Sequence, residues 1–132
     1  VYFMGLLDTF RTSISPKKSV VSNDQRIVNR HYQLLDQINA AYREKNYERT
    51  EKYCLEDVRI FPDFAKAYPK VYPNDHVLPR IPSFEILAKI YDKQGKYHEL
   101  IEICKLALRY KLEDSTKGGF EARIQKAQKK IE

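Results

Sequence analysis

Residues 84–108 read FEILAKIYDKQGKYHELIEICKLAL, and this stretch decides the fold. Before Gly95, apolar side chains recur at helical spacing, at Phe84, Leu87, Ala88 and Tyr91. After Gly95 they recur again, at Tyr97, Leu100, Ile101, Cys104 and Leu108. The spacing predicts two amphipathic helices joined by a tight turn at Gly95. A short turn places the two apolar stripes against each other, so we expect an antiparallel helical hairpin.

A weaker copy of this unit precedes it. Residues 22–24, Ser-Asn-Asp, are typical of a helix start, and apolar residues then mark one helix face to about Lys45. A second helix is predicted over 47–61 and is expected to end at Pro62. When residue 47 is aligned with residue 97, Cys54 falls on Cys104, so the two copies are 50 residues apart.

The second copy resembles a tetratricopeptide repeat, on the residues Leu87, Ala88, Tyr91, Gly95, Tyr97 and Ala107. Pro62 stands where that family commonly carries its closing proline, although the family repeats every 34 residues or so. The ending, residues 116–124, is similar to the close of small uncharacterised bacterial or phage repeat proteins. The resemblance implies an all-α, TPR-like hairpin array that serves as a scaffold for binding other proteins.

The domain organisation follows from these segments. Residues 1–22 are expected to form a short helix and linker, with residues 1–3 as a remnant of cloning. Residues 23–132 are expected to form one helical domain, with hairpins at 23–61 and 83–111. Five of the six prolines fall in 62–82, which is therefore expected to be an ordered, Pro-rich insert between the hairpins. Residues 119–131 form a final amphipathic helix that is expected to cap the array.

Charge and hydropathy narrow the classes of protein. The chain has 132 residues and a net charge of +6, with Lys and Arg interleaved with Asp and Glu. Interleaved charge is typical of solvated helix faces and does not favour nucleic acid as the partner. No run reaches the length of a membrane span and no signal peptide is recognisable, so a cytoplasmic location is expected.

The residues that could carry chemistry form no catalytic or metal-ligating pattern. Cys54 and Cys104 occupy the same repeat position and are expected to be buried, reduced thiols. His31 is expected in the core, and the three histidines lack metal-ligand spacing. Four carboxylates at polar helix positions are expected to be solvated: Glu51, Glu56, Asp57 and Glu102. The sequence therefore predicts a protein that is not an enzyme and holds no cofactor.

The resemblance implies a binding groove lined by the first helix of each hairpin. By position, the first hairpin would present Leu35, Asn39, Tyr42 and Arg43, and the second Glu85, Lys89 and Lys93. The expected function is to bind a peptide or a helix of an unidentified protein, or a second copy of the chain, in this groove. An alternative stays open, in which the basic final helix, with Lys126, Lys129 and Lys130, binds nucleic acid or an acidic surface.

Overall fold

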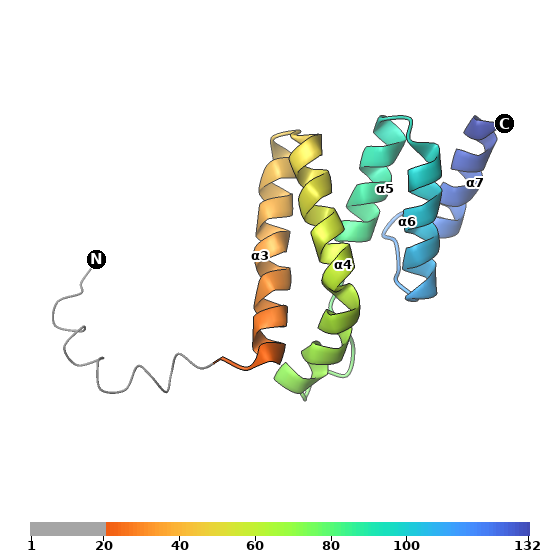
Figure 1. Ribbon diagram of the computed structural model, residues 1–132. Helices are drawn as coiled ribbons and strands as arrows, with labels where there is room; N and C mark the ends of the chain where they lie inside the picture. The colour runs from red at the N-terminus through yellow and green to blue at the C-terminus, as the bar shows by residue number, and fades with distance from the viewer. Residues whose placement is uncertain (1–20) are drawn as a thin grey trace, which may run out of the picture.

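The computed structural model describes residues 21–132 of the chain (Figure 1). The short helix and linker predicted for the first 22 residues therefore lie almost wholly outside the described part. Between Val21 and Glu132 the protein has five helices and no strand, which confirms the all-α prediction. They are α3 (Asn23–Arg43), α4 (Tyr47–Val71), α5 (Ser83–Lys93), α6 (Tyr97–Arg109) and α7 (Gly119–Ile131).

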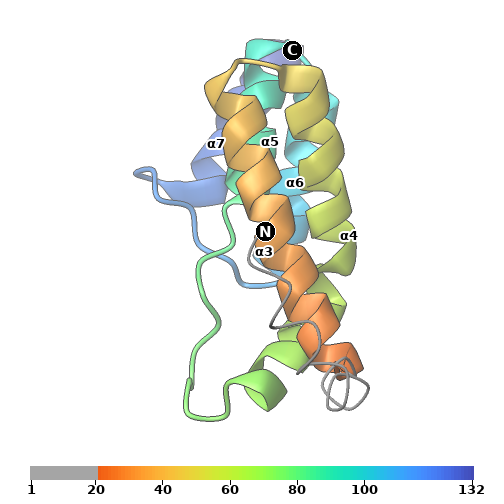
Figure 2. The same ribbon diagram turned by 90° about the vertical axis from the view of Figure 1, so that its left-hand side faces the viewer.

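The helices follow one another in space as they do along the chain. α3 packs on α4, α4 on α5, α5 on α6, and α6 on α7. Figure 1 shows α3 and α4, and then α5 and α6, running in opposite directions through short turns. Seen from the side in Figure 2, α3, α5 and α7 lie along one side and α4 and α6 along the other. The connections that follow α4 and α6 both run over the side of α3, α5 and α7.

The two short turns have the same geometry at positions 50 residues apart. Lys45 and Gly95 both adopt the left-handed conformation, with φ angles of 60° and 71°. The next amide in each turn donates back to a helix carbonyl, Asn46 to Ala41 at 2.9 Å and Lys96 to Tyr91 at 2.8 Å. This pattern is a common way to satisfy the last carbonyls of a helix. The end of α6 has the same geometry, with Lys111 at a φ angle of 60° and the Leu112 amide donating to Ala107 at 3.0 Å, so it is a shared way of ending these helices.

Pro62 does not end the second helix, so the predicted boundary at residue 61 is wrong. α4 continues through Pro62 and Pro69 to Val71, and only residues 72–82 remain as a connection. A proline inside a helix removes one backbone hydrogen bond and costs about 3 kcal/mol. Both prolines lie at exposed positions of the helix, so their rings do not interrupt its buried face. Burial of the apolar face beyond Pro62 offsets the cost, through Phe64, Ala67 and Tyr68.

The core forms one continuous cluster through all five helices. α5 is its centre, because eight of its eleven residues are buried between α4 and α6. Cys54 and Cys104 are both free thiols with no exposed surface, as the repeat alignment predicted. Burial raises the pKa of both thiols, that of Cys104 to about 12, so neither is a reactive thiolate at neutral pH.

α7 covers the last open side of α6, at the bounds that the sequence predicted. Phe120 and Ala127 are buried, and the Arg123 guanidinium pairs with the carboxylate of Asp114, whose side chain has no exposed surface. No described helix is both long and apolar enough to cross a membrane.

Candidate binding surface

The four candidate residues on α3 divide into two kinds. Leu35 and Tyr42 are half-buried and pack on the core, and the Tyr42 ring lies 6.2 Å from that of Tyr47. Asn39 and Arg43 are exposed and stand one helical turn apart. A partner lying on this helix would therefore meet an amide and a guanidinium above a partly apolar base.

The three candidate residues on α5 occupy different environments. Lys93 is exposed, and Lys89 is half-buried with its ammonium 3.1 Å from the Glu85 carboxylate. Glu85 is only 4% exposed. Its oxygens already accept from Arg80 at 3.0 Å and from the Ser115 amide and hydroxyl at 3.0 and 2.7 Å. Because both oxygens of the Glu85 carboxylate are bound by these internal partners, Glu85 stabilises the fold and is not available to a ligand.

The contacts of Glu85 set its pKa. Burial alone would raise the pKa of this carboxyl, but hydrogen bonds from Ser115, Lys89 and Arg80 outweigh burial and lower the pKa to about 2. The ionised carboxylate thus connects α5 to the segment before it and to the segment that follows α6.

A pH dependence of stability follows from the lowered pKa of Glu85. The stability that the ionised Glu85 carboxylate contributes is fully present above the ordinary pKa of 4.5 and is lost as the pH falls toward 2. Over this range the unfolded chain binds a proton at Glu85 and the folded protein does not, so protonation favours unfolding. Urea denaturation of the wild type should show a loss of stability across this range that Glu85→Gln largely lacks. Glu121→Gln, at an exposed position on α7, should keep the wild-type profile. Parallel profiles for Glu85→Gln and wild type would contradict the assignment.

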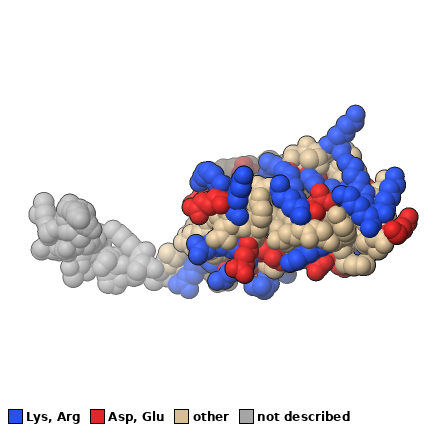
Figure 3. All heavy atoms as spheres, turned by 90° about the horizontal axis from the view of Figure 1, so that it is seen from above, with Lys and Arg blue, Asp and Glu red and all other residues tan. Residues whose placement is uncertain are grey.

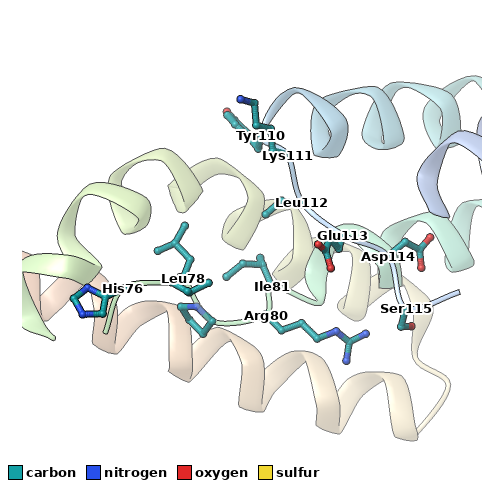
Figure 4. Close-up of a pocket in the computed structure, with 12 residues that line it drawn as sticks. His76, Leu78, Arg80, Ile81, Tyr110, Lys111, Leu112, Glu113, Asp114 and Ser115 are labelled. Carbon is teal, nitrogen blue, oxygen red and sulfur yellow. The ribbon is translucent and has the colours of Figure 1, made fainter. Parts of the chain in front are cut away.

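A cavity of about 590 Å³ lies between the connections that follow α4 and α6. Such a volume is within the range of small-ligand and side-chain pockets. Figure 4 shows Leu78 and Ile81 from one connection and Leu112 from the other turned toward the space between them. The apolar floor can accept an apolar side chain of a partner.

The rim of the cavity is polar. Arg80 is 62% exposed although one of its nitrogens binds Glu85, and Lys111 and Glu113 are exposed. His76 and Tyr110 complete the edge (Figure 4). Glu85 and Asp114 are balanced by their own basic partners, so the rim leaves Lys111 and Glu113 open to charged groups of a ligand.

A second polar cluster is sealed in the core and offers no accessible chemistry. The Asp57 carboxylate is 1% exposed, which makes the prediction of a solvated Asp57 wrong. One of its oxygens lies 2.6 Å from His31 Nδ1, and the other accepts from the Ser83 hydroxyl at 2.8 Å. The order differs from that of a hydrolase triad, because Ser83 donates to the carboxylate and not to the imidazole. His31 is in the core as expected, and its Nε2 has no hydrogen-bond partner.

No described residues form a metal site, since no three His, Cys, Asp or Glu side chains between 21 and 132 converge on one point. Sequence reasoning missed the cavity because its two walls are about 30 residues apart in the chain. The signal that was available was the apolar content of the Pro-rich segment, notably Leu78 and Ile81, which is too high for a solvated linker.

Comparison of the chain with known proteins identifies an uncharacterised relative. No protein-family model matches the chain, and no solved structure matches it. A protein of Aquifex aeolicus (strain VF5), described as an uncharacterized protein, is 29% identical over 73 residues. The match covers 55% of this chain and 35% of that protein, so the chain spans about a third of the length of its relative.

Proposed function

We propose that this protein is a non-enzymatic, TPR-like interaction module that binds a peptide or helix along the side of α3, α5 and α7. The observation that carries the proposal is the 590 Å³ cavity, which opens among connections that run over this side of the array. Repeated helix pairs use such continuous sides as extended binding surfaces.

The chemistry of this side suits an extended or helical segment of a partner. An apolar anchor would enter the cavity between Leu78, Ile81 and Leu112. The exposed amide of Asn39 both donates and accepts, so it matches the needs of a peptide backbone. Arg43 and Lys93 would meet acidic side chains at the rim of the contact, where charges mainly guide association.

Site-specific photo-crosslinking tests which side of the protein meets its partner. A benzophenone side chain placed at Asn39 or Leu78 should give discrete covalent adducts in the source organism. The same group at Lys105, an exposed position on α6, which is not one of the three helices of this side, should give none. Adducts of twice the protein's mass would identify a second copy of the chain as the occupant. Equal labelling from Lys105 would refute the assignment of the binding side.

Reversing the charge of Arg43 should weaken partner binding without unfolding the domain. The guanidinium is exposed and forms no ion pair in residues 21–132, so its loss removes no internal contact. For Arg43→Glu we expect affinity for the crosslinked partner to fall about tenfold, or about 1.4 kcal/mol. Titration calorimetry measures the affinity, and thermal unfolding checks the fold. Arg59→Glu, exposed on α4, is the matched control. Unchanged affinity for Arg43→Glu would remove Arg43 from the surface.

A further inference from the structure

The fold gathers basic residues at one end of the molecule, which we call the turn end. It comprises residues 43–49 at the α3–α4 turn, residues 92–96 at the α5–α6 turn and residues 126–132 at the end of α7. Figure 1 shows all three segments at the same end of the helices. The Lys130 ammonium joins the last two segments, since it lies 3.6 Å from Asp92, and it also lies 5.3 Å from the centre of the ring of Tyr97, which directly follows the second segment.

The turn end carries most of the excess charge of the chain. Its segments hold eight Lys or Arg residues and four acidic ones, in a chain whose net charge is +6. The pair between Lys130 and Asp92 joins two half-exposed groups and is the only ion pair that the turn end makes within the described residues. Figure 3 looks onto this end and shows Lys and Arg side chains along its length, with fewer Asp and Glu between them.

The acidic groups that balance charge elsewhere lie away from the turn end. Glu85 and Asp114 are enclosed by basic partners near the connections at the opposite end. Glu56 binds Arg30 at 2.5 Å, midway along the first helix pair. The internal pairs therefore leave the excess of Lys and Arg over Asp and Glu at the turn end in place.

Helix stability accounts for only some of these cations. Lys93, Lys129 and Lys130 lie in the last turns of α5 and α7, where cations favour the helix dipole. Arg49 lies in the first turn of α4 and Lys96 at the N-cap of α6, where a cation is unfavourable. These two positions are at odds with local stability, which points to a role in meeting a negatively charged partner.

We propose that the turn end binds the phosphate backbone of a nucleic acid, independently of its sequence. The three segments that carry the cations follow one another from the α3–α4 turn to the end of α7 (Figure 1), which suits a linear polyanion. A membrane surface is disfavoured because, among residues 21–132, Ile131 is the one large apolar side chain exposed at this end, and a single side chain gives little insertion into lipid. The sequence does not reveal this surface, because basic and acidic residues alternate along the chain and the three segments of the turn end come together only in the folded protein.

Fluorescence anisotropy with a short labelled DNA duplex tests the turn end. For the wild type we expect the logarithm of affinity to fall linearly with that of salt, with a slope of about −3 or steeper between about 50 and 200 mM. The variant Lys45→Gln/Lys96→Gln/Lys129→Gln should bind about tenfold or more weakly and reduce the slope by about 2.7, which is 0.9 for each lost phosphate contact. The control Arg59→Gln/Lys66→Gln/Lys70→Gln removes the same charge from exposed positions on α4.

The control variant should retain most of the affinity and a slope near that of the wild type. Three outcomes would overturn the proposal: no binding at the lowest salt, equal loss in both triple variants, or binding to anionic lipid vesicles in place of the duplex. The test uses none of the residues proposed to bind a peptide, so its result is independent of the peptide-binding proposal. Circular dichroism of each variant confirms that the helices are intact.

Discussion

Asp57→Ala should lower the free energy of unfolding by about 3–5 kcal/mol, because it leaves buried polar groups without their partner. Asp57 joins three helices, since it lies on α4 and binds His31 of α3 and Ser83 of α5. Both partners are nine-tenths or more buried, so water cannot replace the carboxylate. Urea denaturation followed by circular dichroism measures the loss. The matched control, Asp63→Ala, changes an exposed carboxylate on the same helix and should have little effect.

A double variant tests whether His31 and Asp57 stabilise the protein through their contact with each other. The 50-residue alignment equates His31 with Ile81 and Asp57 with Ala107, so the second copy carries an apolar pair at these positions. His31→Ile/Asp57→Ala should recover part of the stability lost in Asp57→Ala, because no imidazole is then left without its partner, although the buried Ser83 hydroxyl still is. Strictly additive losses would show that the two side chains contribute independently, contrary to the contact at 2.6 Å.

Leu87→Ala should cost about 2–5 kcal/mol, the range for a leucine truncated in a well-packed core. Leu87 has no exposed surface and lies in α5, which packs on both α4 and α6. The cavity left by the truncation would thus weaken the contact between the two helix pairs as well as α5 itself. Chemical denaturation gives the free energy. Leu55→Ala, at a position 37% exposed on α4, is the control and should cost much less. A loss for Leu87→Ala below that of Leu55→Ala would contradict the central position of α5.

Local pattern was sufficient for most of the helices. The apolar spacing around Gly95 predicted α5 and α6 because the turn, the stripe and the cap all act within a few residues. The bounds of α7 were predicted for the same reason. The end of α4 was mispredicted at Pro62, because the energetic cost of a proline in a helix depends on neighbouring residues alone. The burial of Phe64 and Tyr68, which offsets this cost, depends on contacts with residues that are distant in the chain.

The candidate site was less predictable than the fold. Glu85 looks like any helix-surface glutamate in the sequence, and only the approach of Ser115, 30 residues later, makes it a buried anchor. Asp57 was expected in solvent for the same reason, since its partner His31 lies 26 residues earlier. No local rule relates such pairs, because a carboxylate at a polar helix position has the same pattern whether it meets water or another helix.

The sequence by itself determined the all-α fold class, the helices α5, α6 and α7 and the burial of both cysteines, because each depends on side-chain periodicity along one helix. Only the tertiary structure decided the hydrogen-bonded Asp57 cluster, the cavity beside Arg80 and Leu112, and the basic turn end. Each of these three features depends on how the helix pairs stack, which brings together residues that are far apart in the chain.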